Sequence, residues 1–226
     1  CAETVTGRIR RFNFGPNPGN NNPAVTLIIN DSSRRPGNTE VVNVAGNWYL
    51  FFANWGSGGS LFRLDLGPNL ANNNPIPSGL NVGGMGPVDG MTVFQDCGKA
   101  YILASSYNTG QLYRLEFTPD ITSVPTLANL GNFGLAEPGD FSELTRFGDA
   151  WYTLIGSSNA NNGAVRLLKF EPGTTPTAPS STLQNPTISF NTPGTYTARL
   201  YLDENFGSEY GDGIRGQRVI CKTFTV

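Results

Sequence analysis

The stretch that decides the fold is Asp96–Phe117, DCGKAYILASSYNTGQLYRLEF, because it joins two strand patterns through two short polar turns. A Cys-Gly turn leads into a strand around Tyr101, a Ser/Asn/Gly turn follows, and the segment LYRLEF ends the unit. Alternation in LYRLEF has the period of two that is typical of an antiparallel strand. One face is predicted to carry Leu112, Arg114 and Glu116, and the other Tyr113, Leu115 and Phe117.

The same pattern recurs on both sides of this stretch. Residues 45–67 read AGNWYLFFANWGSGGSLFRLDLG, and residues 147–170 read FGDAWYTLIGSSNANNGAVRLLKF. Their tyrosines, Tyr49, Tyr101 and Tyr152, follow one another at intervals of 52 and 51 residues. A further copy of the last strand, RIRRFNFG, stands near the start of the chain. A repeat of this length is the strongest fold signal in the sequence.

The repeat predicts an all-β chain, a β-propeller-like array of four-stranded antiparallel blades in residues 1–175. We expect units at about 1–30, 31–82, 83–131 and 132–175. Propellers usually close with four to eight blades, so either sequence outside this segment or the tail would complete a ring. A chance likeness within a β-sandwich is the alternative interpretation.

The pattern changes in residues 176–226. A Pro/Thr/Ser-rich connection, TTPTAPSSTLQNP, is typical of a linker or a domain edge. The segments PTISFNTPGTYTARLYLDE and RVICKTFTV follow, and their alternation predicts two or three strands of a partial immunoglobulin-like sandwich.

These segments resemble a known family. SFNTPGTYTARLYL and CKTFTV resemble the second half of a PKD domain, and the repeat units resemble those of giant Bacteroidota surface proteins of the gliding-motility adhesin type. The resemblance implies an extracellular, cell-surface adhesin repeat segment that is exported by type IX secretion. Its partners would be other segments of the same large protein or cell-envelope and secretion components. One departure is that the WDFGDG-type segment that normally precedes PGTYT in a PKD domain is missing. The nearest match, EYGDG at residues 209–213, follows PGTYT.

Composition excludes several classes of function. Charged residues make up 14% of the 226 residues and the formal net charge is −2, so the basic surface of a nucleic-acid binder is not expected. The chain has no histidine, which excludes Ser-His-Asp and Cys-His catalysis and His-ligated zinc. The sequence contains no run of 18 apolar residues, so it predicts no membrane-spanning helix. We therefore expect no enzyme activity and no cofactor, with calcium as the one alternative.

The three cysteines leave their pairing open. Cys1, Cys97 and Cys221 have no CxxC spacing that would indicate a metal site or a redox pair. Cys1 is either the acylated residue of a lipoprotein subunit or an internal residue of a longer chain.

Three kinds of residue are candidates for a site. Trp55 lies in a Gly/Ser turn and has no counterpart in the other units, so it is the candidate for stacking on a surface glycan, whereas Trp48 and Trp151 are expected in the core. Asp89 and Asp140 precede the repeat tyrosines by 12 residues and would be either turn formers or paired carboxylates. One acidic loop is either a weak calcium site or simply a solvated loop, and its carboxylates are Asp203, Glu204, Glu209 and Asp212.

Together these observations predict a non-catalytic structural or adhesive segment of a large surface protein. Two alternatives stay open: a carbohydrate-binding or carbohydrate-active propeller, and a lipoprotein subunit of a cell-envelope complex.

Overall fold

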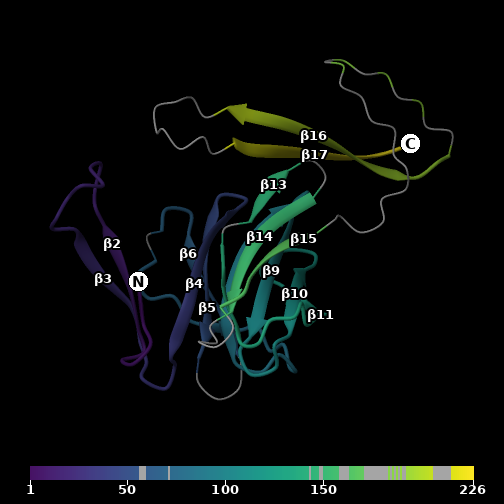
Figure 1. The fold of residues 1–226 in the computed structure, drawn as a ribbon. Coiled ribbons are helices and arrows are strands. Elements are labelled where there is room, and N and C mark those ends of the chain that lie inside the picture. The colour runs from purple at the N-terminus through teal and green to yellow at the C-terminus, as the bar shows by residue number, and fades with distance from the viewer. Residues whose placement is uncertain are drawn as a thin grey trace.

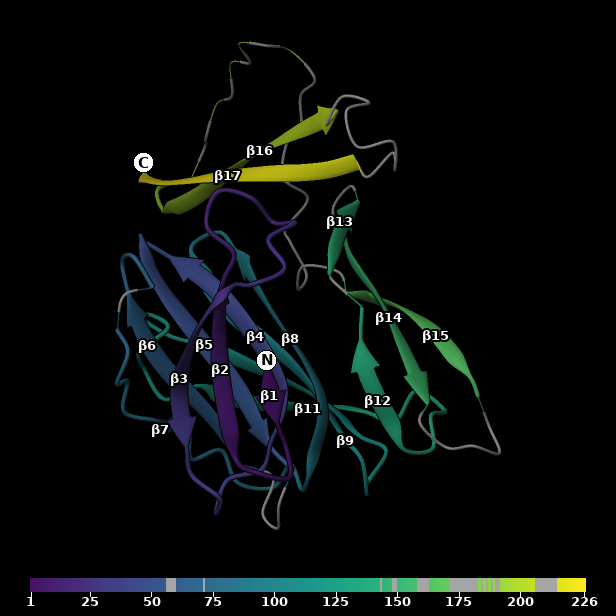
Figure 2. The same cartoon turned by 90° about the vertical axis from the view of Figure 1, so that its left-hand side faces the viewer.

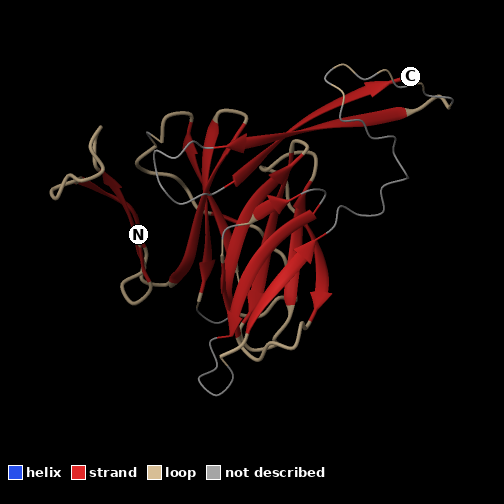
Figure 3. Ribbon diagram, turned by 45° about the horizontal axis from the view of Figure 1, so that its top comes forward, coloured by secondary structure: helices blue, strands red, loops and turns tan. Residues whose placement is uncertain are grey.

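The computed structural model describes residues 1–55, 60–70, 72–142, 144–147, 150–157, 163–170, 192–205 and 215–226, with positions 183, 185, 187 and 189. Every regular element in these residues is a β-strand (Figure 3). The prediction of an all-β fold of antiparallel sheets is confirmed. No helix in the described part of the chain is long and apolar enough to cross a bilayer.

The strands form five separate antiparallel sheets, which we number in chain order (Figure 1). Sheet 1 contains β1 (Ala2–Glu3), β2 (Arg8–Asn13) and β3 (Ala24–Asn30). Sheet 2 contains β4 (Pro36–Val44), β5 (Asn47–Asn54), β6 (Leu61–Gly67) and β7 (Ser78–Gly79). Sheet 3 contains β8 (Val88–Asp96), β9 (Lys99–Ser106), β10 (Leu112–Phe117) and β11 (Thr126–Gly131).

Sheet 4 is interrupted. It contains β12 (Pro138–Phe141), β13 (Thr145–Phe147), β14 (Ala150–Ser157) and β15 (Val165–Phe170). Strands β12 and β13 both pair with β14, so together they take the place that β4 and β8 hold in the complete sheets. Sheet 5 is a hairpin of β16 (Thr195–Asn205) and β17 (Arg215–Thr225).

Strand register shows that sheets 2, 3 and 4 repeat one design. Tyr49 lies opposite Asp65, Tyr101 opposite Glu116, and Tyr152 opposite Lys169. The three repeat tyrosines therefore hold the same place in the second strand of each sheet. The alternation predicted for β10 is also correct, because the Tyr113, Leu115 and Phe117 side chains all enter one core cluster.

Two-residue turns start the repeat unit in sheets 2 and 3. Ala45 and Gly46 join β4 to β5, and Cys97 and Gly98 join β8 to β9, all four with positive φ. Such type I′ turns match the right-handed twist of the strands, and glycine takes the second position without strain. The register of each tyrosine strand follows from this turn.

Hydrophobic cores lie between successive sheets. The largest core joins sheets 2 and 3, where the Phe51 and Phe117 rings lie 5.7 Å apart. A second core joins sheets 1 and 2 around Phe52, and a third joins sheets 3 and 4 around Ile155. Burying one such side chain stabilises the fold by about 1.5–3 kcal/mol. A single sheet could not bury both of its apolar faces, so the sheets depend on their neighbours.

The array is not closed into a ring by the described sheets (Figure 2). Phe51, Leu103 and Leu154 hold equivalent positions, and their exposed fractions are 0%, 1% and 46%. In sheets 2 and 3 this position is covered, whereas on sheet 4 it is open. The free face of sheet 1 also exposes apolar side chains, since Phe12 and Val25 are exposed and paired across β2 and β3.

The C-terminal hairpin is fastened to sheet 3. A disulfide joins Cys97 in the β8–β9 turn to Cys221 in β17, with a Cα–Cα distance of 5.1 Å. Arg199 of β16 adds an ion pair to Asp96, with Nη2 3.4 Å from Oδ2. Cys1 is free and exposed. The described part of residues 176–226 forms a two-stranded sheet, and the larger PKD-like sandwich stays a prediction.

Candidate functional site

The candidate site lies where the first strands of sheets 2, 3 and 4 meet. Strand β8 runs beside both β4 and β12, and all three strands begin with an irregular register. The shifts fall between Pro36 and Thr39, between Val88 and Met91, and between Pro138 and Phe141. Such β-bulges bend a strand and re-aim its side chains. Three consecutive sheets thus each bring a bulge to the same place.

The bulges carry the polar residues of the site. Gly37 and Asn38 lie in the first bulge, Asp89 in the second and Asp140 in the third. Both aspartates therefore lie within strands, and the interpretation of them as turn formers is wrong. Their places are not equivalent, because Asp89 is the first residue of its bulge and Asp140 the second. The interruption of sheet 4 after Phe141 accompanies this shift of one residue.

Close packing of the backbone holds β8 against β12. Gly90 lies so near to β12 that a Cβ atom there would come within 2.2 Å of the Gly139 carbonyl oxygen. The fully buried Ser105 hydroxyl accepts a hydrogen bond from Gly90 N (2.9 Å) and donates one to Gly139 O (2.9 Å). These two glycines stand directly beside Asp89 and Asp140, so their contact fixes the spacing of the two carboxylates.

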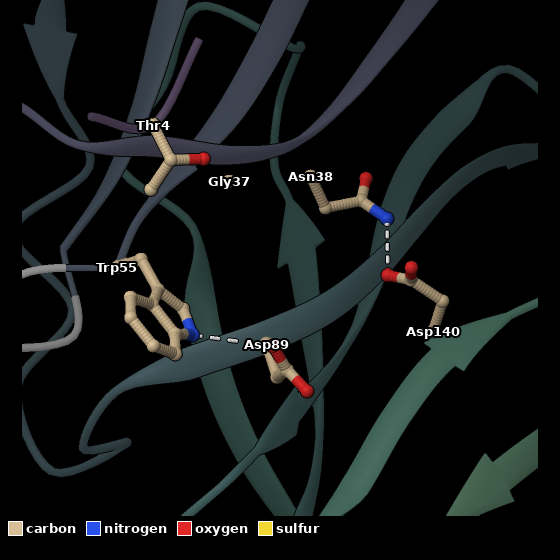
Figure 4. A pocket seen from close by; sticks show the side chains of 6 residues that line it. All are labelled: Thr4, Gly37, Asn38, Trp55, Asp89 and Asp140. Atoms are coloured by element: carbon tan, nitrogen blue, oxygen red, sulfur yellow. Dashed lines mark hydrogen bonds between the residues drawn. The ribbon is translucent and has the colours of Figure 1, made fainter. Parts of the chain in front are cut away.

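The pocket between these strands has a volume of about 340 Å³ (Figure 4). Its described lining consists of Thr4, Gly37, Asn38, Trp55, Asp89 and Asp140. This volume is within the usual range for a small-molecule site. The lining comes from sheets 2, 3 and 4 and from the β1–β2 connection, so no single repeat could form the pocket.

Trp55 follows β5 directly and forms one wall. Its backbone N–H donates to the Arg35 carbonyl at 2.8 Å, and its indole Nε1 donates to Asp89 Oδ1 at 3.2 Å. The side chain stays 45% exposed, so part of its ring remains open to a ligand. The absence of a side chain at Gly37, next to the Trp55 ring in the lining, leaves room beside it.

Asn38 and Asp140 form the opposite wall. Asn38 Nδ2 donates to Asp140 Oδ1 at 2.7 Å, and Asn38 Oδ1 is buried without a hydrogen-bond partner among the described residues. The amide thus gives its donor end to the carboxylate. At the rim, the Thr4 hydroxyl donates to the Pro36 carbonyl at 2.9 Å, which holds the β1–β2 connection over β4.

The electrostatics of the pocket are acidic. Burial raises the pKa of Asp89 above its usual value, and the negative charge of Asp140 raises it further. The hydrogen bond from Trp55 acts in the opposite direction but does not cancel these effects. Among the described residues that line the pocket, two are acidic and none is basic.

The structure brings together three of the residues that the sequence singles out, Trp55, Asp89 and Asp140. It separates them from Trp48, which packs against the core of sheets 1 and 2, and from Trp151, whose ring lies 5.3 Å from that of Phe94. Sequence reasoning missed Thr4 and Asn38. Gly37 lies 52 residues before Asp89 and is its counterpart in the repeat, and Asn38 is the next residue. The place of Asn38 beside this counterpart is the one feature of the sequence that could have indicated it.

The calcium candidates do not form a described site. Asp203 and Glu204 lie in β16, opposite Gln217 and Gly216, and Glu209 and Asp212 lie outside the described residues. The one cluster of metal-ligating residue types in the described part is Asp96, Cys97 and Cys221. Its two sulfur atoms are bonded to each other, so they are not free to act as thiolate ligands.

Comparisons with known proteins identify no family. No protein-family model matches the chain, and no curated protein matches its sequence. Among solved structures, the chain is similar to an α-L-arabinofuranosidase from Podospora anserina, determined in complex with cellotriose. The identity is 18% and the TM-score 0.43, with 66% of this chain covered. The chain spans about half the length of that enzyme, of which 51% is covered.

Proposed function

We propose that this chain is a carbohydrate-binding repeat array of a bacterial surface protein, and that its adhesive role is to hold glycans in the pocket between sheets 2, 3 and 4. The observation that carries the proposal is the meeting of Trp55, Asp89 and Asp140 from three sheets in one cavity of about 340 Å³.

The chemistry of the lining suits a sugar. Sugar rings have apolar C–H faces and hydroxyl-rich edges, so a site needs an apolar surface with polar groups placed around it. The half-exposed Trp55 ring offers the apolar surface, and its indole N–H already donates a hydrogen bond to Asp89. The carboxylates of Asp89 and Asp140 accept hydrogen bonds from hydroxyl groups, and charge-assisted bonds of this kind are short and strong.

The cell-surface part of the proposal has separate support. Disulfides persist mainly in oxidising environments, and Cys97 is bonded to Cys221. The resemblance to gliding-motility adhesins and their PKD domains supports export by type IX secretion and placement in a larger surface protein. In that setting, other segments of the same protein or of the cell envelope would be its partners.

The proposal is tested by screening the purified chain on a glycan array and measuring the hits by calorimetry. We expect binding that Trp55→Ala weakens by about tenfold or more, because the ring supplies the apolar contact. Phe133→Ala is the matched control, since Phe133 is also an exposed aromatic residue but lies outside the pocket. The proposal is wrong if no glycan binds at millimolar concentration, or if both variants weaken binding equally.

A second candidate is hydrolysis of the bound glycan. It is favoured by one observation, that Asp89 and Asp140 line the same pocket, because glycoside hydrolysis uses a pair of carboxyl groups. Burial and the charge of Asp140 raise the pKa of Asp89, which is the direction that suits a general acid. The test is release of reducing ends from the glycans found on the array. Activity lost in both Asp89→Asn and Asp140→Asn would support this candidate, and binding without release supports the non-catalytic adhesin.

A further inference from the structure

We propose that the pocket selects saccharides that carry a primary ammonium group, that is, amino sugars such as glucosamine oligomers. This inference rests on the proposed function and adds the chemical class of the ligand.

The first argument is uncompensated charge. Asp89 and Asp140 contribute two carboxylates, and the groups that hydrogen-bond to them, the Trp55 indole and the Asn38 amide, are neutral. Neutral donors orient a carboxylate but do not offset its charge. No basic side chain lines the described part of the pocket. A ligand with a positive charge would offset the negative charge of the two carboxylates.

The second argument is the count of acceptors. Each carboxylate receives its described hydrogen bond at Oδ1, and no described donor reaches Oδ2 of Asp89 or of Asp140. A carboxylate has about four lone-pair positions, and an ammonium group has three donors and no acceptor. The two carboxylates therefore retain acceptors that an ammonium group can use.

The third argument is size and shape. A pocket of about 340 Å³ lies within the volume range of small-molecule sites and is far larger than a site for one small ion. The Trp55 ring on the same cavity offers an apolar surface that an ion does not need. A sugar ring with an amino substituent uses both the ring and the carboxylates. A neutral sugar leaves the charges uncompensated, and a uronic acid adds a third negative charge.

The experiment uses the intact chain and three trimers of one size: glucosamine, N-acetylglucosamine and galacturonic acid. Binding is measured by calorimetry at pH 6.5. We expect the glucosamine trimer to bind about tenfold more tightly than its N-acetylated counterpart, because a hydrogen bond between charged groups is stronger than one between neutral groups. The galacturonic acid trimer should not bind.

Variants of the pocket distinguish the contribution of the carboxylate charges to binding from the contribution of the Trp55 ring. Asp89→Asn and Asp140→Asn keep an acceptor for Trp55 and for Asn38. Each should therefore weaken binding of the glucosamine trimer more than binding of the N-acetylated trimer, so that the preference for glucosamine falls. Trp55→Ala should weaken both sugars. Asp120→Asn removes an exposed carboxylate of the β10–β11 connection and should change neither affinity.

Each outcome has one meaning. Equal or tighter binding of the N-acetylated trimer overturns the inference and leaves the proposed function standing. Binding of none of the three trimers, combined with an array on which no glycan binds, overturns both. A trilysine peptide that binds as tightly as the glucosamine trimer, with the same loss in Asp89→Asn, overturns the assignment to a sugar.

Discussion

Trp55 donates its indole N–H to Asp89 across the boundary between sheets 2 and 3, with 3.2 Å between Nε1 and Oδ1. The hydrogen bond joins the residue that follows β5 to a bulge of β8. It couples the position of the Trp55 ring to the protonation of Asp89, because a hydrogen-bond donor to a carboxylate favours its ionised form.

Replacing Trp55 with phenylalanine tests this coupling. Trp55→Phe keeps an aromatic ring but removes the donor that lowers the pKa of Asp89, so we expect that pKa to rise above its value in the unmodified chain. The measurement is NMR titration of the side-chain carboxyl carbon. Asp120, whose pKa is lowered by Thr122, serves as the internal control and should not shift. An unchanged titration of Asp89 would contradict the coupling.

The charge of Asp89 should cost stability at neutral pH. Because burial raises its pKa in the folded state, the folded chain holds the proton more tightly than the unfolded chain. The stability that Asp89 contributes is therefore fully present below the unfolded pKa, about 3.9, and is lost as pH rises through the raised value. Asp89→Asn removes this cost, so it should stabilise the chain at pH 7 by up to about 1 kcal/mol.

The gain from Asp89→Asn should disappear at pH 3, where the aspartate is protonated in both states. Urea unfolding of the variant and the unmodified chain at the two pH values provides the measurement. A difference of the same size at both would show that the effect of the substitution is not electrostatic.

Gly90 should tolerate no side chain. A Cβ atom at this position would lie 2.2 Å from the Gly139 carbonyl oxygen, so Gly90→Ala must push β8 away from β12. We expect a loss of about 1–3 kcal/mol in unfolding free energy, together with weaker glycan binding. The control is Gly156→Ala in β14, where nothing lies within 4 Å of the new Cβ. Comparable losses in the two variants would refute the close approach.

The open face of sheet 4 should be visible in a pair of leucine substitutions. Leu103 and Leu154 hold equivalent places, but only Leu103 is buried. Leu103→Ala should cost about 2–5 kcal/mol, whereas Leu154→Ala should cost less than about 1 kcal/mol. Chemical denaturation of the isolated chain gives both values. If the two losses are similar, Leu154 is covered in solution.

The disulfide should hold the C-terminal hairpin to sheet 3. Cys221→Ser removes a cross-link between residues 124 positions apart, and loss of such a constraint typically costs about 2–4 kcal/mol. We expect earlier proteolytic cleavage within residues 195–226 than within sheet 3. Cys1→Ser is the matched control because Cys1 is free and exposed. The attachment would be refuted if both variants resisted protease as well as the unmodified chain.

Local pattern accounts for much of the fold. Alternation in segments such as LYRLEF predicted strands, and the spacing of Tyr49, Tyr101 and Tyr152 predicted their equivalent registers, because both depend on neighbours within one hairpin. The interruption of sheet 4 was not predictable in this way. Its two short first strands pair with β14 on the same side, and no periodicity marks the break.

The candidate site was predictable only in part. Trp55 stood out because it has no counterpart in the other units, and Asp89 and Asp140 because their spacing matches the repeat. These three residues line one pocket with Asn38 and Thr4 because of the way in which three sheets pack against one another. The pairing of Cys97 with Cys221 is of the same kind, since it joins a turn of sheet 3 to a strand of the tail.

The amino-acid sequence by itself determined the strands, their turns and the unit that repeats, since side-chain alternation and turn residues act over a few positions. Only the tertiary structure decided which bulges face one another, which leucine is covered and which carboxylates share a pocket. Those outcomes depend on contacts between residues far apart in the chain, from 34 positions for Trp55 and Asp89 to 102 for Asn38 and Asp140. The close approach of Gly90 to Gly139 is a packing contact of the same kind, which no local pattern records.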